Sequence, residues 1–362
     1  MTTCQVYNST DENITKCSDQ ICNGNIVVFP TETVYGIGSS ALNPEAVNKI
    51  YKIKKRPNNN PLIMHVLNWD GAKLYTNLND LETKLCKLLT DKFWPGPLTI
   101  LVKKSSYVID EVCAGNNWVA LRASNHLVLR KLIEKSMVPI VAPSANISGK
   151  VTSTYKDHVI NYFKNNDISI ITEDEPSNIG IESTIVKIDN NDISIVRPGF
   201  ITVEDISNCL SEIQNININQ LNLRQQTNSP GSDISHYTTN KKTYMFNFEI
   251  INKFNGNNAY SEQIKNTTRE YLKQCAIIDF KQINSKYYDY FGAHVDISES
   301  GNLNEALFNL YNVLHQLNLT DIKVILIFDF WSNKNGLYNT IYDRFYRCAS
   351  GKYLLIPLNF IE

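Results

Sequence analysis

The sequence changes character between Glu212 and Asn240, where a polar stretch separates two parts that each alternate apolar runs with amphipathic stretches. This stretch is rich in Asn, Gln and Ser and contains a Pro-Gly pair, as is typical of a linker. The chain has 362 residues, which exceeds the roughly 100–200 residues of a usual domain. We therefore expect two domains, 1–212 and 241–362, joined by a linker at 213–240.

Short apolar runs in the first part predict β-strands. The runs lie at 25–30, 97–104, 118–124 and 138–146, and a hairpin is predicted at 183–199. A helix is predicted after the first run, because Asn43 is a suitable N-cap and Pro44 suits the first helical position. The second part repeats this alternation, with apolar runs at 273–280 and 322–330 and an amphipathic helix between them at 302–318. The fold class is therefore α/β (α+β).

Bulk properties exclude several classes of protein. The net charge of −1 and the pI of about 6.6 give no overall field that would attract nucleic acid or a membrane surface. The eight cysteines are scattered without a Cys-x-x-Cys pair, which argues against structural zinc and favours a reducing, cytoplasmic location. No apolar run reaches the roughly 18 residues of a transmembrane helix.

Positive charge gathers at the end of the predicted helix. Lys54 lies four residues after Ile50 and so projects from the apolar face of this helix. Arg56 lies where the helix must end, because Pro57 disfavours helical geometry before it. These two cations either reach into a cleft or only complement the helix dipole.

Polar side chains follow two of the predicted strands, where α/β sheets tend to bind ligands. Thr31, Glu32 and Thr33 follow the first run, and Ser144 and Asn146 end the run at 138–146. Either set is also consistent with a turn closed by its own hydrogen bonds. The glycines after Thr33 allow close backbone approach, but they form no dinucleotide fingerprint, and no P-loop occurs.

Two arginines stand out in the predicted strands. Arg122 lies among apolar residues, and an inward-facing arginine needs an anionic partner. Ser183 and Arg197 lie near opposite ends of the hairpin, and the register of its strands decides whether they meet. With few acids near these segments and no Ser-His-Asp order, the pattern favours an electrostatic cradle over an acid/base site.

These motifs together resemble the YrdC/Sua5 family. FPTETVYGIG, KKRPNNNPLIMHV, FWPGPLTILV, VALRAS, VAPSANISG, IESTIV and VRPG occur in the order and spacing of that family. SPGSDISHY and GLYNTIYDRFYRCASGKY are similar to the two-domain Sua5 form. The resemblance implies a YrdC-like twisted mixed sheet with a basic concave cavity, and a small Rossmann-like C-terminal domain.

The resemblance also implies an activity. Such enzymes are L-threonylcarbamoyladenylate synthases, which join L-threonine, bicarbonate and ATP, with Mg²⁺, and release pyrophosphate. The product feeds the t6A modification of tRNA, so a tRNA threonylcarbamoyl transferase is the expected downstream partner. Neither a membrane partner nor stable nucleic-acid binding is expected.

Individual roles follow from the matching positions. Lys54 and Arg56 are the implied catalytic residues, because they would hold the nucleotide phosphates. The implied ATP contacts are Arg56, Asn60, Ser144, Thr152, Arg197, His236 and Tyr237. The implied L-threonine contacts are Thr33, His65, Arg122 and Ser183, with Arg122 clamping the carboxylate. Where the family usually has HY-x-P, this chain has HYTT, which would loosen the closure of the linker over the nucleotide.

Two alternatives stay open at this point. Hydrogenase-maturation carbamoyltransferases contain a YrdC-like module, but they also carry zinc-binding Cys pairs that this sequence lacks. An RNA-binding module would use the same basic cavity. The near-neutral charge and the lack of an aromatic stacking platform beside the cations weigh against RNA binding.

Overall fold

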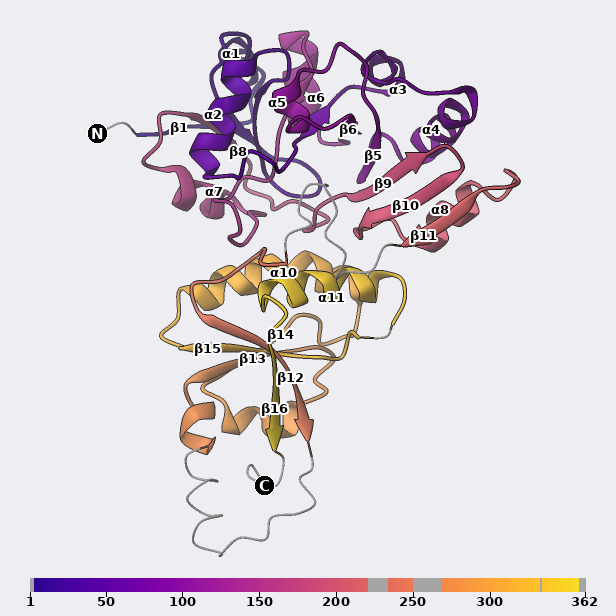
Figure 1. The fold of residues 1–362 in the computed structure, drawn as a ribbon. Helices are drawn as coiled ribbons and strands as arrows, with labels where there is room; N and C mark the ends of the chain where they lie inside the picture. Colours follow the sequence, from indigo (N-terminus) through magenta and orange to yellow (C-terminus); the bar gives the residue numbers. More distant parts are fainter. Residues whose placement is uncertain (1–2, 221–233, 250–267, 333, 358–362) are drawn as a thin grey trace, which may run out of the picture. The chain divides into compact units, whose positions relative to one another are not determined.

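The structure is a computed structural model that describes residues 3–220, 234–249, 268–332 and 334–357 (Figure 1). Contacts within the chain divide it into two compact units. The first unit holds Met1–Ser148 and Thr152–Ser232, and the second holds Gly149–Val151 and Asp233–Glu362. None of the helices in the described ranges combines the length and apolarity that crossing a bilayer requires.

The first unit is built on an 11-stranded mixed sheet in the order β1-β8-β2-β3-β7-β4-β6-β5-β9-β10-β11. Its strands are β1 Gln5–Asn8, β2 Val27–Phe29, β3 Gly36–Ser40, β4 Ile63–His65, β5 Leu98–Lys103, β6 Trp118–Arg122, β7 Ile140–Val141, β8 Ser169–Thr172, β9 Thr184–Asp189, β10 Asp192–Arg197 and β11 Asn217–Gln220. Its helices are α1 Asp11–Cys22, α2 Pro44–Lys54, α3 Trp69–Ala72, η1 Lys73–Tyr75, α4 Asp80–Phe93, α5 Asp110–Cys113, α6 Leu127–Ser136, α7 Lys156–Phe163 and α8 Val203–Cys209. The predicted strands and the predicted antiparallel hairpin, now β9 and β10, are confirmed.

Helix α2 begins as the sequence predicts. The Asn43 side chain accepts a hydrogen bond from the Ala46 backbone N–H, which caps the first turn. The helix ends because Lys55 takes the left-handed conformation at φ 52°, two residues before Pro57.

The glycine-containing segment after Thr33 forms strand β3, which the sequence did not predict. Strand β3 pairs antiparallel with both β2 and β7. A Cβ at Gly38 would lie 2.6 Å from the Val141 carbonyl oxygen, so only glycine permits this pairing. The close backbone approach expected of these glycines is thus the approach of a neighbouring strand.

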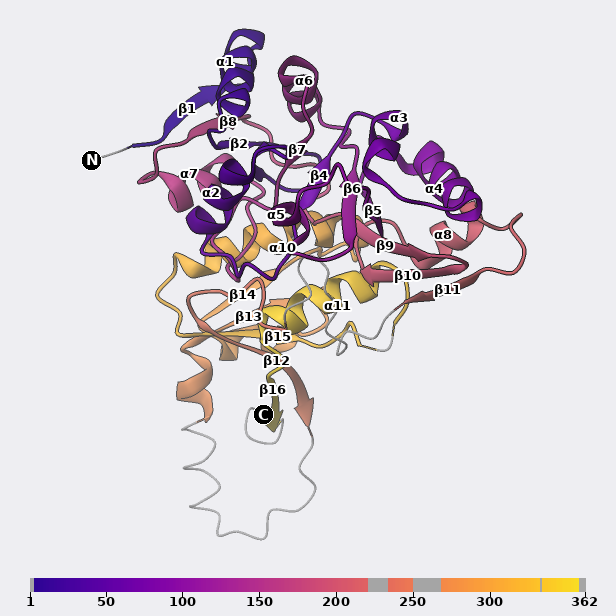
Figure 2. The same ribbon diagram turned by 45° about the horizontal axis from the view of Figure 1, so that its top comes forward.

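Both faces of the first sheet carry apolar side chains. One face supports the large core, which includes Met64, Ile100 and Leu121 and packs against α2 and α4. On the other face, α1 and α6 pack together over β2, β7 and β8 (Figure 1 and Figure 2). Further along that second face, over β4, β6, β5 and β9, lies a small apolar cluster of Ile63, Leu101, Ala120 and Ile185.

The second unit has an all-parallel five-stranded sheet in the order β14-β13-β15-β12-β16. Its elements are β12 Lys242–Glu249, β13 Cys275–Asp279, η2 Ser285–Tyr290, β14 Ala293–Asp296, α10 Leu303–Asn318, β15 Val324–Phe328, α11 Leu337–Cys348 and β16 Tyr353–Pro357. The two strands and the helix predicted in this part are confirmed as β13, β15 and α10. Helices α10 and α11 lie side by side on one face of this sheet (Figure 1 and Figure 2).

The segment expected as linker contains regular structure. Strand β11 lies inside the predicted range 213–240 and pairs in parallel with β10 at the edge of the first sheet. Ile216 and Ile218 pack against the large core, so apolar residues two apart anchor this polar stretch. Farther along, Thr238 donates from its backbone N–H to the Gly149 carbonyl at 2.7 Å, within the second unit. The rest of the expected linker, 221–233, lies outside the described residues.

Candidate substrate site

Four neighbouring strands place polar side chains in a row on the second face of the first sheet. Side chains alternate along a strand, so His65 lies on the same face as Ile63, and Arg122 on the same face as Ala120. The same argument places Thr99 beside Leu101 and Ser183 beside Ile185. We call His65, Thr99, Arg122 and Ser183 the polar row.

Strand register brings the members of the polar row together. His65 and Arg122 are Cα partners in the parallel pair β4–β6. Thr99 lies on β5, which pairs with β6 on one side and with β9 on the other. The Thr99 and Ser183 hydroxyls share a hydrogen bond of 2.7 Å. Residues from four distant parts of the sequence therefore meet where four adjacent strands end or begin, on one side of the sheet.

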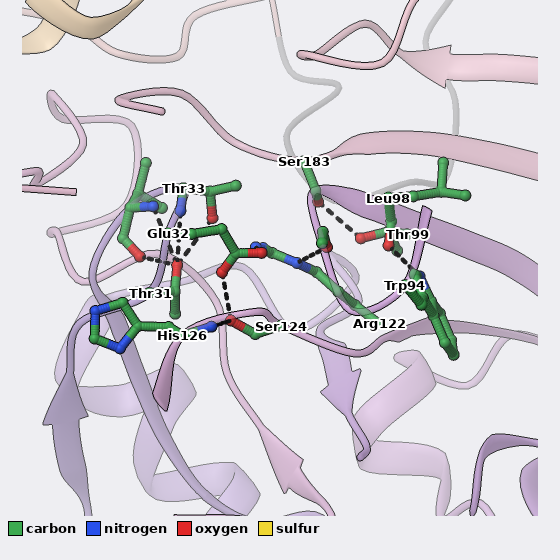
Figure 3. A network of polar contacts seen from close by, with 12 residues as sticks. Thr31, Glu32, Thr33, Trp94, Leu98, Thr99, Arg122, Ser124, His126 and Ser183 are labelled. Carbon is green, nitrogen blue, oxygen red and sulfur yellow. Dashed lines mark hydrogen bonds and ion pairs between the residues drawn. The ribbon is translucent and has the colours of Figure 1, made fainter. Parts of the chain in front are cut away.

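Arg122 has an acidic partner in this structure. Its Nη2 lies 2.7 Å from Oε1 of Glu32, and its Nε donates to the Gly96 carbonyl at 3.3 Å. The other Glu32 oxygen accepts from the Ser124 hydroxyl (Figure 3). Burial raises the pKa of Glu32, but Arg122 and the hydrogen bonds from Ser124 and the Asn125 backbone lower this pKa overall. Glu32 therefore stays a carboxylate, and it is the anion that the inward arginine was predicted to need.

His65 is a buried neutral base beside Arg122. Burial, followed by the positive charge of Arg122, lowers the pKa of His65 to about 3. Its Nδ1 is buried and has no hydrogen-bond partner among the described residues. The imidazole is therefore uncharged at neutral pH and has an unused hydrogen-bonding position.

Ser183 and Arg197, whose meeting depended on the hairpin register, are in contact. Arg197 Nη2 donates to the Ser183 carbonyl at 2.9 Å and to the Ser183 hydroxyl at 3.0 Å. The register of β9 and β10 shifts between Ile195 and Arg197, and Arg197 pairs with Ile185 after this irregularity. The irregularity thus brings the guanidinium to the start of β9.

Thr33 belongs to a turn directly after β2. Its hydroxyl lies 2.9 Å from the Thr31 hydroxyl, which donates to the Val34 carbonyl at 2.6 Å. Figure 3 shows Thr33 on one side of the Glu32–Arg122 pair and Ser183 on the other. The structure therefore places Thr33, Arg122 and Ser183 in one region, each with hydrogen-bond partners of its own, and His65 is the strand neighbour of Arg122.

A second cluster joins the end of α2 to the loop after β7. Lys54 is 1% exposed, which agrees with its predicted apolar-face position. Its ammonium donates to the carbonyls of Ser144 and Asn146, each at 2.5 Å, and the Ser144 hydroxyl donates to the Asn146 side chain at 2.6 Å. Burial and then the charge of Arg56 hold the pKa of Lys54 well below its ordinary value, while Glu182 acts in the opposite direction.

Arg56 closes the loop that follows α2. Its Nε donates to the Asn60 carbonyl at 3.0 Å, and its Nη2 donates to the Asn60 side chain and to the Pro61 carbonyl at 2.5 and 2.8 Å. The Tyr51 hydroxyl also donates to the Asn60 carbonyl at 3.1 Å. Arg56 and Asn60 are therefore in direct contact, as a shared site would require.

Two buried carboxylates were missing from the predicted site, so the expectation of few acids in this region is wrong. Glu32 pairs with Arg122, and Glu182 accepts from the Thr152 hydroxyl at 2.7 Å. Both acids are at most 6% exposed. The sequence could have indicated both acids, because each directly precedes a predicted threonine contact, Glu32 before Thr33 and Glu182 before Ser183.

His236 and Tyr237 belong to the second unit. Tyr237 is fully buried at φ 61°, its ring 5.4 Å from that of Tyr311 and 5.4 Å from the Arg344 guanidinium carbon. Arg344 in turn donates to Asp343 within α11. The role of His236 and Tyr237 at the nucleotide stays a prediction.

The sequence matches two protein families. Residues 19–199 match the family of Sua5, YciO and YrdC proteins described as "Telomere recombination", and residues 201–350 match "Threonylcarbamoyl-AMP synthase, C-terminal domain". Threonylcarbamoyl-AMP synthase of Pyrococcus abyssi is 31% identical over 306 residues, which cover 84% of this chain and 85% of the relative. The chain belongs to the Sua5 family of threonylcarbamoyl-AMP synthases.

Other members support this family assignment over most of the chain. Threonylcarbamoyl-AMP synthase of Schizosaccharomyces pombe is 30% identical over 355 residues, which cover 90% of this chain and 85% of the relative. The crystal structure of P. abyssi Sua5 complexed with L-threonine superposes with a TM-score of 0.80 at 28% identity, over 98% of this chain and 99% of that one. The resemblance to the two-domain Sua5 form is thereby confirmed.

Proposed function

We propose that the polar row and the Lys54–Arg56 cluster form one site, in which this Sua5-family enzyme makes threonylcarbamoyl-AMP from L-threonine, bicarbonate and ATP. The observation that carries the proposal is that Thr33, His65, Arg122 and Ser183, which come from four separate segments, lie in one region of the first unit. These positions come from motifs far apart in the sequence, and a shared site accounts for the polar groups that all of them carry. The structure of a relative with L-threonine adds support.

L-Threonine would bind along the polar row. The Arg122 guanidinium offers a planar donor fork that suits a carboxylate, which is why lysine would be a poor replacement. The Ser183 and Thr33 hydroxyls and the unused His65 nitrogen would serve the polar groups of the substrate. The neighbouring apolar cluster of Ile63, Ala120, Leu101 and Ile185 would contact its methyl group.

ATP would bind at the second cluster. Lys54 and Arg56 would hold the phosphates, and Asn60, Ser144, Thr152 and Arg197 would provide further contacts. Both cations now donate to backbone carbonyls. A phosphate would replace these neutral acceptors by charged ones and would offset the desolvation of the Lys54 ammonium.

The reaction requires positioning more than proton transfer. Bicarbonate supplies CO₂ by losing hydroxide. The threonine amine adds to the carbon of CO₂ and loses a proton, which neutralises the hydroxide to water and gives a carbamate. A carbamate oxygen then attacks the α-phosphorus of ATP, and the bond to pyrophosphate breaks. Lys54 and Arg56 would stabilise the negative charge that develops on the leaving pyrophosphate.

Mg²⁺ belongs to this proposal as the companion of ATP. No group of three or more His, Cys, Asp or Glu side chains is placed to hold a metal in the described part of the chain. Glu182 is a carboxylate near Lys54. One carboxylate fits Mg²⁺, because this ion usually takes one or two protein carboxylates and is otherwise coordinated by phosphates and water. When bound, Mg²⁺ would neutralise phosphate charge.

The remaining expectations about architecture and cellular role are part of the same proposal. The second face of the first sheet would form the basic concave cavity, because Arg122 and, by strand alternation, Lys103 and Lys187 lie on it. The second unit would be the family's Rossmann-like domain, although β15 lies between β12 and β13 and so departs from the usual order. A cytoplasmic location, where the product would serve a tRNA-modifying transferase, belongs to the same proposal.

Domain limits of 1–212 and 241–362 also stay part of this proposal, with 213–240 joining them and supplying His236 and Tyr237 as nucleotide contacts. Family membership favours the synthase over an RNA-binding module.

Pyrophosphate release from ATP tests the proposal. The assay compares complete reactions with reactions that lack L-threonine or bicarbonate, and release should require both. Release at an equal rate without threonine would contradict the proposal. Salt-dependent tRNA binding without any consumption of ATP would instead support an RNA-binding module.

A further inference from the structure

Glu32 and Arg122 form a buried pair of opposite charges beside the polar row. The facing atoms, Glu32 Oε1 and Arg122 Nη2, lie 2.7 Å apart, with side-chain exposures of 7% and 5%. An α-amino acid carries one positive and one negative group on the same carbon atom. A substrate carboxylate on Arg122 therefore brings its ammonium group close to Glu32.

The facing atoms of this pair still have hydrogen-bonding capacity. Within the described residues, Glu32 Oε1 and Arg122 Nη2 have each other as ion-pair partners and no further hydrogen bond. A carboxylate oxygen can accept two hydrogen bonds and a guanidinium NH₂ group can donate two, so each atom can bind a ligand group besides its ion-pair partner. A zwitterion provides both partners, an N–H donor for Oε1 and an oxygen acceptor for Nη2.

The surroundings favour an ammonium group at Glu32. Glu32 is the carboxylate of the network in Figure 3, and the Ser124 hydroxyl fixes its orientation through the other oxygen. The Thr31 and Thr33 hydroxyls are bonded to each other, so they do not compete for Oε1. His65, the strand neighbour of Arg122, is uncharged at neutral pH and does not repel a cation.

We propose that Glu32 binds the α-ammonium group of threonine, so that Glu32 and Arg122 together recognise the amino-acid zwitterion. This inference rests on the proposed function, because it assumes that threonine binds at the polar row. It assigns Glu32 a role in substrate recognition. The consequence is selectivity, since a ligand that has the carboxylate and hydroxyl of threonine but no amine would leave Glu32 with Arg122 alone.

Calorimetric titration of the full chain with two ligands tests this role. The ligands are L-threonine and (R)-3-hydroxybutyrate, which is threonine without its amino group. Glu32→Gln should bind threonine about 10- to 100-fold more weakly, as expected when a hydrogen bond to a charged group is lost. Its affinity for hydroxybutyrate should change by less than about threefold. Glu82→Gln is the matched control, because Glu82 is also buried, at 2% exposed, and caps α4 away from the polar row.

The outcomes distinguish two roles of Glu32, binding the ammonium group of threonine and merely orienting Arg122. Unchanged threonine affinity in Glu32→Gln would overturn the inference, and an equal loss for both ligands would show that Glu32 only orients Arg122. If Glu32→Gln fails to fold, Glu32→Asp replaces it, because aspartate keeps the charge. Glu32→Asp should still bind threonine at least tenfold more tightly than hydroxybutyrate, and loss of that preference would count against the proposal. Wild-type protein without threonine-dependent pyrophosphate release would instead contradict the proposed function.

Discussion

Protonation of His65 should destabilise the first unit as the pH falls. The folded-state pKa of about 3 lies below the ordinary value of 6.5, because the imidazole is buried beside Arg122. The folded state therefore binds this proton less readily than the unfolded chain does. The stability that depends on a neutral His65 is fully present above pH 6.5 and is lost progressively as the pH falls toward 3.

The size of this effect at pH 5 follows from the two pKa values. At pH 5 the pH lies about 1.5 units below the pKa of 6.5 in the unfolded chain, and each unit corresponds to about 1.36 kcal/mol. Protonation of His65 therefore stabilises the unfolded chain by about 2 kcal/mol, whereas the folded state, with its pKa of about 3, stays almost unprotonated. Wild-type protein should thus lose about 2 kcal/mol of unfolding free energy through His65 between pH 7.5 and pH 5. His65→Gln should lose about 2 kcal/mol less over the same interval, because glutamine does not titrate.

Urea unfolding followed by tryptophan fluorescence measures this difference, since Trp69, Trp94 and Trp118 all belong to the first unit. His294→Gln, an exposed substitution in the second unit, is the control and should follow the wild type. A direct check is the NMR signal of the His65 imidazole, which should not shift between pH 7.5 and pH 5. A midpoint near 6.5 in that signal, or equal pH dependence of wild type and His65→Gln, would refute the reasoning.

Three further substitutions test the clusters separately. Lys54→Met leaves two buried carbonyls without their ammonium donor and should lower the unfolding free energy by about 2–4 kcal/mol. The control Lys52→Met, at an exposed position, should change the unfolding free energy by less than about 0.5 kcal/mol. Equal urea midpoints of the two variants would contradict this prediction. Arg122→Lys should raise the KM for threonine at least tenfold in the pyrophosphate assay, and an effect confined to ATP would exclude a carboxylate clamp. Asp343→Asn removes the negative charge that two arginines of α11 share and should destabilise the second unit by about 3 kcal/mol; an unchanged Trp331 fluorescence transition would argue otherwise.

Elements with a strong apolar period could be predicted from the sequence. Helices α2 and α10 have apolar side chains whose spacing indicates one buried face. Strands β5 and β6 are short apolar runs, as is typical of strands buried on both faces, and β9 and β10 flank the turn of a hairpin. Strand β3 escaped prediction because its glycines carry no apolar signal, and their value lies in letting β7 approach. Strand β11 escaped because its stability comes from pairing with β10 at a sheet edge, which a polar local sequence does not reveal.

The candidate site was predictable as a set of positions but not as a set of contacts. The family motifs name Thr33, His65, Arg122 and Ser183, and strand register explains why they meet. The partners of the cations depend on which loops fold back against them, so no spacing rule predicts that Lys54 binds carbonyl oxygens. Glu32 was visible in its motif, but its pairing with Arg122 requires the turn after β2 to lie against β6.

This pattern of partners has a physical cause that bears on how the site selects ligands. A site for anions needs buried cations, and a buried cation without a partner is too costly to retain in a folded protein. Each cation is accordingly held by the protein itself, Arg122 by Glu32, Lys54 by two carbonyls, Arg56 by Asn60, and Arg197 by Ser183.

Ligand binding at such a site is an exchange of partners, and its free energy is the difference between what the ligand offers and what it displaces. A simple anion offers charge alone and must compete with acceptors that are already well placed. Threonine and ATP offer several groups at fixed spacing, so they replace several partners at once. Selectivity at this site therefore comes from the geometry of the whole exchange and not from the net charge of the chain, which is −1.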